Sequence, residues 1–465
     1  MLDLGLLLAQ LIVVLLVARL SGRLVKLLGQ PAVVGEMIAG LALGPSVFGA
    51  VAPAAMHTLF PTDKLLPLAT LSQLGVVLFM FVVGLRLDLS VLRCKARTAV
   101  AVSHAGIVAP FLLGVALANL LHADLAPPGV AFLPFALFMG AAMSITAFPV
   151  LARILDERKM LNSRIGAIAI AAAAIDDATA WCILAAVLAV ATATANGGSG
   201  WSTFAVTLGS TLAYVLLIAF GLRPILTRWA TGVVAKLKPA TAPFATDVVT
   251  SQMVSIAVVG ALASAWTTEM LGVHALFGAF VAGAVVPRID VSTRPAESVH
   301  AIAGSNGQFA PTATPAINLS DAIANRIDSV VSAVLLPVFF AFVGLRTSVG
   351  LISGAGLWTV FALILLVAVS GKMGGAAAAA KLTGLGWRDA LSIGALMNTR
   401  GLMELVILNV GLDIGVISPA LFAMMVLMAL VTTVMTSPLV AWLYRAPDEA
   451  TAFVSSAPLS KPGRA

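Results

Sequence analysis

The sequence predicts an all-α membrane protein. Apolar residues make up 60% of its 465 residues and charged residues only 10%, and the mean hydropathy is +1.06. A soluble domain carries about 25% charged residues. The apolar residues fall into long runs separated by short basic segments, and about 20 such residues can cross a bilayer as a helix. We therefore expect a bundle of about 13 transmembrane helices.

The expected spans follow the apolar runs, each long enough at about 1.5 Å per residue to cross the hydrocarbon. The ninth run is short and rich in glycine. The spans are residues 2–21, 32–50, 66–86, 98–121, 129–154, 162–193, 203–225, 247–268, 273–287, 329–349, 355–380, 389–411 and 417–443.

The basic residues predict the orientation. If the N-terminus lies outside, 23 of the 27 lysines and arginines fall in cytoplasmic segments. Basic loops stay cytoplasmic, so we expect the N-terminus outside and the C-terminus in the cytoplasm, in the plasma (inner) membrane. This alternation requires an odd number of spans. The net charge of +7 is spread in small clusters, which disfavours a nucleic-acid partner.

Residues 1–445 are expected to form one transmembrane domain. Within it, residues 289–326 form the longest polar break, which we interpret as a flexible cytoplasmic linker between two halves, ending in a short amphipathic helix. Residues 446–465 should form a short disordered cytoplasmic tail. The first run should remain as a membrane helix, because its basic cluster follows it instead of preceding it. Cys94 and Cys182 suggest neither a disulfide framework nor a metal site.

Asp176 and Asp177 lie side by side in the middle of the apolar run of residues 165–191. A charge at that depth costs about 2.5–3.5 kcal/mol on insertion scales. Such residues usually face a watery cavity or a partner charge, and they mark ion or proton pathways. The alternative is that the two carboxylates only hold neighbouring helices together.

Lys372 lies near the middle of the eleventh run. Lysine side chains near span ends extend to the membrane–water interface. Lys372 is too deep for this, so its charge needs a nearby anion. Asp176 or Asp177 could supply it, and the glycines and alanines around both sites permit close helix approach. The alternative is an ion pair with no role in transport.

The fifth run is interrupted by Pro149. The proline leaves the Ile145 carbonyl without its helical partner and disfavours α geometry at Phe148. Open backbone at bilayer depth is tolerated where it lines a cavity or is buried in protein. A broken helix here would aim carbonyls and the Thr146 hydroxyl at a cation; the alternative is an ordinary proline kink.

The twelfth run contains a second polar segment, residues 396–404. Laid on the fifth run, it places Thr399 on Thr146. Two interrupted segments in corresponding halves are typical of inverted-repeat transporters. Arg400 and Glu404 are four residues apart and can pair on one helix face, and we favour this structural role over direct ion binding.

Six motifs together resemble the second branch of the monovalent cation/proton antiporters, which includes bacterial sodium or potassium/proton antiporters and plant cation/proton exchangers. They occur in family order over about residues 30–410. The motifs are residues 30–46, 144–153, 175–177, 337–347, 371–372 and 397–405.

The resemblance implies an antiporter fold with inverted repeats, in which the interrupted fifth and twelfth spans cross. It also implies a mobile core domain and a dimerisation domain, hence a homodimer. By the same resemblance Asp177 is the principal carrier of cation and proton, the site of the monovalent metal ion. Asp176 then pairs with Lys372, and Thr146 adds an oxygen ligand.

Further motif residues are expected to support this site. By the resemblance, no cofactor is needed and the protein is not an enzyme. The paired aspartates with a membrane lysine resemble the electrogenic members. The linker of residues 289–326 looks longer than is common in the family, and no nucleotide-binding tail is seen. The supporting residues are Ser144, Asn398, Thr399, Arg400, Glu404 and Arg346, although extension to the interface is the role we favour for Arg346.

The expected function is secondary active exchange of Na⁺ or K⁺ for protons by alternating access. A potassium efflux system and a cation-coupled solute carrier of the same fold are the alternatives. An intramembrane aspartyl protease is disfavoured, because its aspartates come from separate helices and no Gly-x-Gly-Asp segment occurs. A membrane scaffold explains neither the deep charges nor the interrupted helices.

Overall fold

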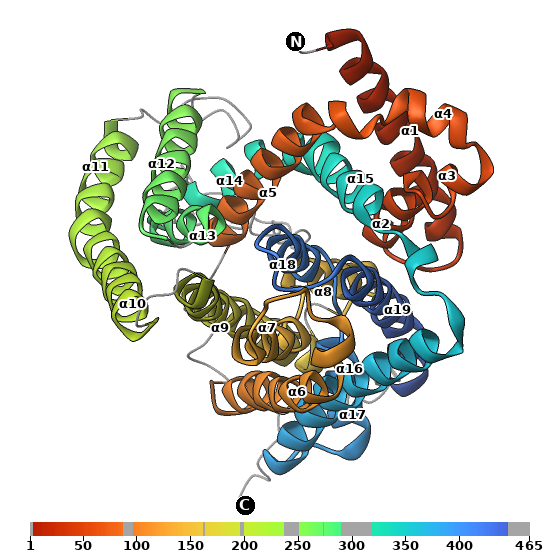
Figure 1. Ribbon diagram of the computed structural model, residues 1–465. Helices are drawn as coiled ribbons and strands as arrows, with labels where there is room; N and C mark the ends of the chain where they lie inside the picture. The colour runs from red at the N-terminus through yellow and green to blue at the C-terminus, as the bar shows by residue number, and fades with distance from the viewer. Residues whose placement is uncertain are drawn as a thin grey trace, which may run out of the picture.

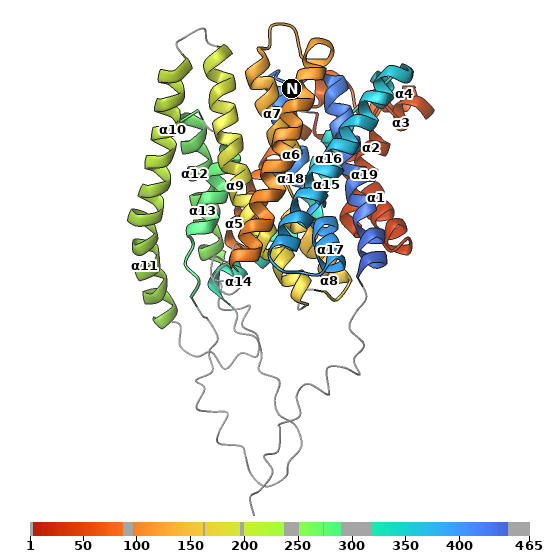
Figure 2. The ribbon, with the colours of Figure 1, turned by 90° about the horizontal axis from the view of Figure 1, so that it is seen from below.

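The computed structural model describes residues 3–86, 96–160, 163–195, 200–236, 251–272, 274–289 and 318–444. Cys94, residues 290–317 of the predicted linker and the predicted tail of residues 446–465 lie outside these ranges. The described chain folds into helices, most of which run roughly side by side (Figure 2).

Short π-helical turns, residues 217–222 and 331–335, join α10 to α11 and α14 to α15. The helices are α1 (Leu4–Leu27), α2 (Ala32–Leu43), α3 (Phe48–Val51), α4 (Pro53–Leu59), α5 (Leu66–Arg86), α6 (Ala96–Leu125), α7 (Phe132–Ser144), α8 (Phe148–Glu157), α9 (Arg164–Ala195), α10 (Gly200–Leu216), α11 (Arg223–Lys236), α12 (Ser251–Met270), α13 (Ala275–Val285), α14 (Leu319–Val330), α15 (Leu336–Arg346), α16 (Gly354–Leu382), α17 (Trp387–Met397), α18 (Leu402–Asp413) and α19 (Pro419–Leu443).

Eleven helical segments in the described chain are long and apolar enough to cross a membrane, and α17 with α18, bent by 44°, makes up to twelve. Each predicted span has a helix at its position. The predicted ninth span corresponds to α13, whose 11 residues cover only about 17 Å at 1.5 Å per residue. That is short of the roughly 30 Å of hydrocarbon, so a thirteenth crossing stays a prediction.

The tenth span begins earlier than predicted. The helical segment runs over Leu319–Leu351, whereas the sequence suggested residues 329–349. The amphipathic helix expected at the end of the linker is therefore the first part of α14, and it continues directly into α15. Leu319, Ile323 and Ile327 are buried, which explains why this polar stretch is held in the bundle.

Two groups of helices lie next to each other in Figure 1. The panel group comprises α1, α2, α5 and α12–α15, and the core group comprises α6–α9 and α16–α19. Within the panel group α5 packs on α13 and α15, and α2 packs on α1 and α15; within the core group α6 packs on α7 and α16. Helices α10 and α11 stand at the edge of the molecule, where α10 contacts α9.

Glycines bring α2 and α15 into backbone contact. A Cβ atom added to Gly344 would lie 1.8 Å from the Gly40 carbonyl oxygen, and one added to Gly40 would lie 2.1 Å from the Phe340 carbonyl oxygen. Both obstacles are backbone atoms, which cannot rotate away. Small residues at such crossings let transmembrane helices approach closely, so this pair of glycines fixes the spacing within the panel group.

Replacing Gly344 by alanine should therefore destabilise the panel group. Overpacking of this kind costs about 1–3 kcal/mol, measurable as a lower unfolding temperature of the detergent-purified protein. Gly260→Ala in α12 is the matched control, because nothing lies within 4 Å of a Cβ atom at that position. Equal unfolding temperatures for the two variants would contradict the assigned packing.

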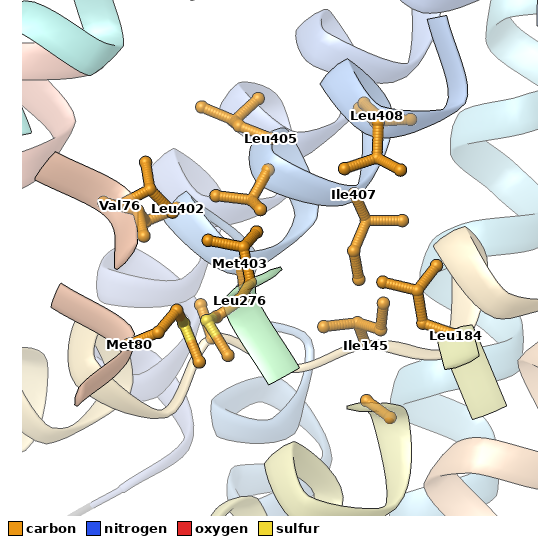
Figure 3. Packing of buried hydrophobic residues seen from close by; sticks show 14 of the residues in the cluster. Val76, Met80, Ile145, Leu184, Leu276, Leu402, Met403, Leu405, Ile407 and Leu408 are labelled. Carbon is orange, nitrogen blue, oxygen red and sulfur yellow. The ribbon is translucent and has the colours of Figure 1, made fainter. Parts of the chain in front are cut away.

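The surface between the panel and core groups is apolar in its middle. Figure 3 shows Val76 and Met80 of α5 together with Leu402 and Met403 of α18, with Leu276 of α13 beside them. All five side chains are buried or nearly so and belong to one hydrophobic cluster. The contact between the two groups is therefore formed here by apolar side chains.

Candidate functional site

Two helices are interrupted at the centre of the core group. The break between α7 and α8 covers residues 145–147, and the break between α17 and α18 covers residues 398–401. The expectation of interrupted fifth and twelfth spans is confirmed. Helix ends left in the middle of a bundle expose backbone donors and acceptors, so their partners decide what the site can do.

The two breaks cross and hold each other. The backbone N–H of Ala147 donates to the Thr399 carbonyl oxygen at 3.0 Å. The Thr146 hydroxyl lies 3.0 Å from the Met397 carbonyl oxygen. Thr146 and Thr399, which the comparison of the two runs placed in register, therefore lie at the same crossing.

The break in the fifth span lies before Phe148 and not at it. Phe148 is the first residue of α8, and Ala147 before it is extended, with φ −88° and ψ 90°. The prediction that Phe148 leaves α geometry is wrong. Pro149 occupies the first turn of α8, where its missing N–H breaks no helical bond, and the bond from Ala147 to Thr399 holds the extended backbone at the break.

Lys372 meets Asp176 inside the bundle. Its Nζ lies 2.6 Å from Asp176 Oδ2, and both side chains are 0% exposed. Lys372 also donates to the Ser144 carbonyl oxygen at the end of α7. The lysine thus satisfies one carboxylate and one open helix end together. Of the two aspartates that the sequence left open as its partner, the structure brings Asp176 to it.

Asp176 accepts two more hydrogen bonds. The Thr146 hydroxyl lies 2.5 Å from Oδ2, and the Ser103 hydroxyl of α6 donates to Oδ1 at 3.0 Å. Sequence reasoning missed Ser103, since a single serine in an apolar helix gives no sign of which face it occupies. Donors on α6 and α16 and in the break between α7 and α8 therefore hold the Asp176 carboxyl in one position.

Asp177 stands in contrast to its neighbour. It is 1% exposed, and within the described chain neither of its carboxylate oxygens has a hydrogen-bond partner. The backbone N–H of Phe148, in the first turn of α8, lies near this carboxyl, but it does not form a hydrogen bond of good geometry with it. A helix N-terminus favours negative charge, so Asp177 is placed where an anion is tolerated but is left open for a ligand.

Asn398 shares this lack of partners. It is 0% exposed, and both atoms of its side-chain amide are without a hydrogen bond among the residues that the structure describes. Buried amides without partners are rare and call for a water or an ion. Its place in the break between α17 and α18 puts it at the crossing.

Arg400 and Glu404 form the predicted ion pair. Arg400 Nη1 lies 3.0 Å from Glu404 Oε1, and both side chains are buried. Arg400 also donates to the carbonyl oxygens of Ala142 at 3.1 Å and Met143 at 2.6 Å, in the last turn of α7. A cation at a helix C-terminus is stabilising, so Arg400 supports the end of α7, as a structural pair would.

Arg346 lies away from this cluster. Its guanidinium contacts Asp413 at 2.7 Å and Asn409 at 3.0 Å and lies over the Phe342 ring at 5.5 Å. It therefore joins α15 of the panel group to α18 of the core group, in addition to any extension toward the membrane–water interface. We call this contact the Arg346 latch.

Two cavities flank the apolar surface between the groups. One, of about 400 Å³, is lined by residues of α8 and α14, the helices at the lower end in Figure 2. The second, of about 240 Å³, lies beside the Arg346 latch. Phe148, whose backbone N–H lies near the Asp177 carboxyl, lines the first cavity. Polar residues of the first cavity are Glu36, Arg86, Arg153, Asp156, Asp328 and Ser332, and those of the second are Ser72, Gln73, Glu269, His274, Asn409 and Asp413.

Two interrupted helices that cross around buried, paired charges define the class of secondary transporters. The model of the family described as the transmembrane sodium/hydrogen exchanger matches residues 12–445, and the chain belongs to this family. Its members are transporters and not enzymes. The resemblance drawn from the six motifs is confirmed.

Relatives extend this family assignment. The chain is 38% identical over 451 residues to the Na(+)/H(+) antiporter NhaS4 of Synechocystis, covering 95% of this chain and 98% of the relative. It is 37% identical over 442 residues to Cation/H(+) antiporter 17 of Arabidopsis thaliana and 33% identical over 449 residues to K(+)/H(+) antiporter 1 of Saccharomyces cerevisiae, in each case covering 95% of this chain. The chain spans only 49% and 46% of those two relatives.

A solved structure shares the fold. The sodium proton antiporter MjNhaP1 of Methanocaldococcus jannaschii superposes with a TM-score of 0.60 at 14% identity, covering 93% of this chain and 95% of that one. The antiporter fold expected from the sequence is therefore confirmed.

Proposed function

We propose that this protein exchanges a monovalent cation, Na⁺ or K⁺, for protons by alternating access, with Asp177 as the carrier. The observation that carries the proposal is the contrast between two adjacent buried carboxylates. Asp176 accepts three hydrogen bonds, whereas both oxygens of Asp177 are open. One carboxylate can bind a proton or a cation but not both, so competition for Asp177 couples the two fluxes.

Groups at the crossing of the two interrupted helices would complete a cation site with Asp177. The Thr146 hydroxyl donates its one hydrogen bond to Asp176, the nearer of its two acceptors, and its oxygen lone pairs remain for a cation. The unpartnered amide oxygen of Asn398 is a second neutral ligand. Lys372 is engaged with Asp176 and does not repel the cation as a free charge would. Oxygen ligands of this kind suit hard cations.

We expect access to Asp177 from the larger cavity in this conformation, because Phe148 lies beside the Asp177 carboxyl and lines that cavity. The larger cavity contains Arg86 and Arg153, which the distribution of basic residues assigns to the cytoplasmic side, with the N-terminus outside. The apolar surface between the groups separates it from the smaller, outer cavity. Movement of the core group along the panel group would then expose Asp177 to the outside. A homodimer in the plasma membrane, formed through the panel group, completes the proposal.

Exchange is tested with the purified full-length protein in proteoliposomes that enclose a pH-sensitive dye. With an acidic interior, external Na⁺ or K⁺ should raise the internal pH, and choline should not. Li⁺ serves as a third cation for selectivity. Cation uptake without proton release would overturn exchange and favour an efflux system, and no response to any of the three cations would overturn the proposal.

The Arg346 latch should keep the outer cavity closed. Asp413→Asn removes the charge partner of Arg346, a partly exposed pair worth up to about 1 kcal/mol, or up to roughly fivefold in an equilibrium. We therefore expect Val76→Cys, on the wall of this cavity, to react about two to five times faster with an impermeant thiol reagent added outside. Cys94 and Cys182 are first replaced by serine.

Glu269→Gln is the control for the latch. Glu269 lines the same cavity, but its carboxylate accepts from the Ala275 backbone within the panel group. Its removal should leave the labelling rate unchanged. A labelling rate that rises equally in both variants would mean that cavity charge, and not the latch, controls access.

A further inference from the structure

Gln30 lies in the turn between α1 and α2 and reaches across to the core group. Its Nε2 donates to the Val434 carbonyl oxygen of α19 at 2.9 Å, and α19 packs against α2 (Figure 1). The amide oxygen of Gln30 is buried and has no hydrogen-bond partner in the described chain. A buried acceptor without a partner costs free energy, so the amide is held in this place by the contact that its NH2 group makes.

The turn that carries Gln30 has a fixed backbone. Gly29 has a φ of +71°, and its N–H donates to the Lys26 carbonyl oxygen at 3.0 Å, while the Gln30 N–H donates to the Val25 carbonyl oxygen at 3.2 Å. These two bonds form a Schellman motif, which ends a helix at a glycine in the left-handed region. Pro31 follows with its φ fixed by the ring. The backbone at Gln30 therefore has little freedom to follow a movement of the core group.

The acceptor is a carbonyl group that proline deprives of its usual partner. Pro438 lies inside α19, four residues after Val434. Because proline has no backbone N–H, the helical hydrogen bond to the Val434 carbonyl oxygen is missing. Transmembrane helices tolerate proline where a neighbouring helix satisfies the freed group. Here the Gln30 amide of the panel group takes the place of the missing donor.

This bond reaches the part of the core group that holds the candidate site. The Thr433 hydroxyl, next to Val434, lies 3.2 Å from the Arg400 backbone nitrogen and 2.6 Å from the Arg400 carbonyl oxygen, in the break between α17 and α18. One turn of α19 thus contacts both the panel group and the break. An N–H···O hydrogen bond spans only about 2.7–3.2 Å, so movement of the crossing along the panel group must break the bond from Gln30 to Val434.

The contact is separate from the Arg346 latch. Gly344, two residues before Arg346, packs on Gly44 at the end of α2. Gln30 precedes the start of α2, whose 12 residues cover about 18 Å. The two contacts therefore join the groups near opposite ends of α2, and either can be removed without the other.

We propose that Gln30 is a positioning residue for the transport cycle. Its bond to Val434 holds the core group in the present conformation, in which we expect Asp177 to face the larger cavity, and the bond breaks each time the site turns to the opposite side. The inference rests on the proposed function. It adds to that function a contact that sets the balance between the two conformations.

The test compares the accessibility of the two cavities in the full-length protein. Val76→Cys reports on the outer cavity, and Ala152→Cys on α8 reports on the larger one, each in a chain whose Cys94 and Cys182 are replaced by serine. An impermeant thiol reagent is added outside for the first reporter and, in everted vesicles, to the cytoplasmic face for the second. The ratio of the two labelling rates then follows the ratio of the two conformations.

Gln30→Met keeps the length of the side chain and removes its N–H donors. The ratio of outer to inner labelling should rise about two- to tenfold, the effect of losing one neutral hydrogen bond. Pro438→Ala keeps Gln30 but gives the Val434 carbonyl oxygen a helical donor that competes with the amide. Its shift should have the same direction and be smaller, because a carbonyl oxygen can accept two hydrogen bonds. This variant serves if Gln30→Met does not fold.

Gln10→Met is the matched control. Gln10 is 1% exposed, and its Nε2 donates to the Leu59 carbonyl oxygen at 2.8 Å, so the variant loses the same kind of bond. That bond joins α1 to α4 and does not reach the core group. The variant should unfold at a lower temperature, but its labelling ratio should match that of the unsubstituted reporters.

The outcomes separate the two proposals. An unchanged labelling ratio in both Gln30→Met and Pro438→Ala overturns the role of Gln30 alone, as does a ratio that rises equally in Gln10→Met. If both labelling rates rise together without a change in their ratio, the bond only stabilises the fold, which also overturns that role. Absence of cation-driven proton release from the wild type overturns the exchange function itself.

Discussion

Asp177→Asn is expected to abolish cation-driven proton release, lowering it by about 100-fold or more. Asparagine cannot take up the transported proton, and it offers the cation a dipole in place of a charge. A contact to a charged group is worth about 1.5–3 kcal/mol, and 1.4 kcal/mol corresponds to about tenfold. The rate is measured in proteoliposomes over a range of Na⁺ and K⁺ concentrations, so that a loss of binding appears as a rise in the half-saturating concentration.

Asp156→Asn is the control for this experiment. Asp156 lines the larger cavity but takes no part in the buried cluster, so its removal should change the rate modestly. The Asp177→Asn variant should elute as folded protein, because neither oxygen of Asp177 makes a hydrogen bond in the described chain that the change would remove. Undiminished exchange by Asp177→Asn would show that another group carries the ions.

Lys372→Met is expected to cause the largest loss of stability. The variant leaves Asp176 as a buried anion without a counter-ion and frees the Ser144 carbonyl oxygen. Removing one partner of a buried ion pair costs about 3–5 kcal/mol. This is a large share of the stability of an ordinary protein domain, so the thermal unfolding of the purified protein in detergent should occur at a markedly lower temperature.

The double variant Asp176→Asn with Lys372→Met should recover most of this stability. The asparagine is neutral; its amide oxygen accepts from one of the two hydroxyls, Ser103 or Thr146, and its NH2 group donates to the oxygen of the other, so no buried charge is left alone. Lys381→Met, near the end of the same helix and beside Trp387, is the control and should cost less than about 1 kcal/mol. If the double variant were less stable than Lys372→Met, the coupling between the two charges would be absent.

The sequence predicted those features of the fold that depend on short stretches of chain. Hydropathy places a helix at each expected span, because crossing the hydrocarbon requires a continuous apolar run. The polar segments around Thr146 and Thr399 interrupt such runs, and this is what predicted the two interrupted helices. The boundaries of α14 were misjudged, since burial of Leu319 and Ile323 against other helices overrides the polar character of that stretch.

The partners in the site could not be read from the sequence alone. Asp176 and Asp177 are adjacent on a helix and point about 100° apart, and only the packing of α9 on its neighbours decides which one faces Lys372. Ser103 and Asp413 lie far along the chain from the residues that they contact. Their roles depend on how each helix is rotated about its axis in the bundle, which a single sequence does not encode locally.

The Asp177 carboxylate, which has no hydrogen-bond partner in the described chain, bears on whether the protein moves without its ions. Lys372 with Asp176, and Arg400 with Glu404, are neutral as pairs, so an unloaded core group would carry one bare negative charge past the apolar surface that contains Met80 and Met403. The penalty for such a charge in a medium of low polarity is several kcal/mol. In the proposed mechanism, an unloaded carrier would therefore stay on one side, and slippage would be suppressed by the cost of moving an uncompensated ion.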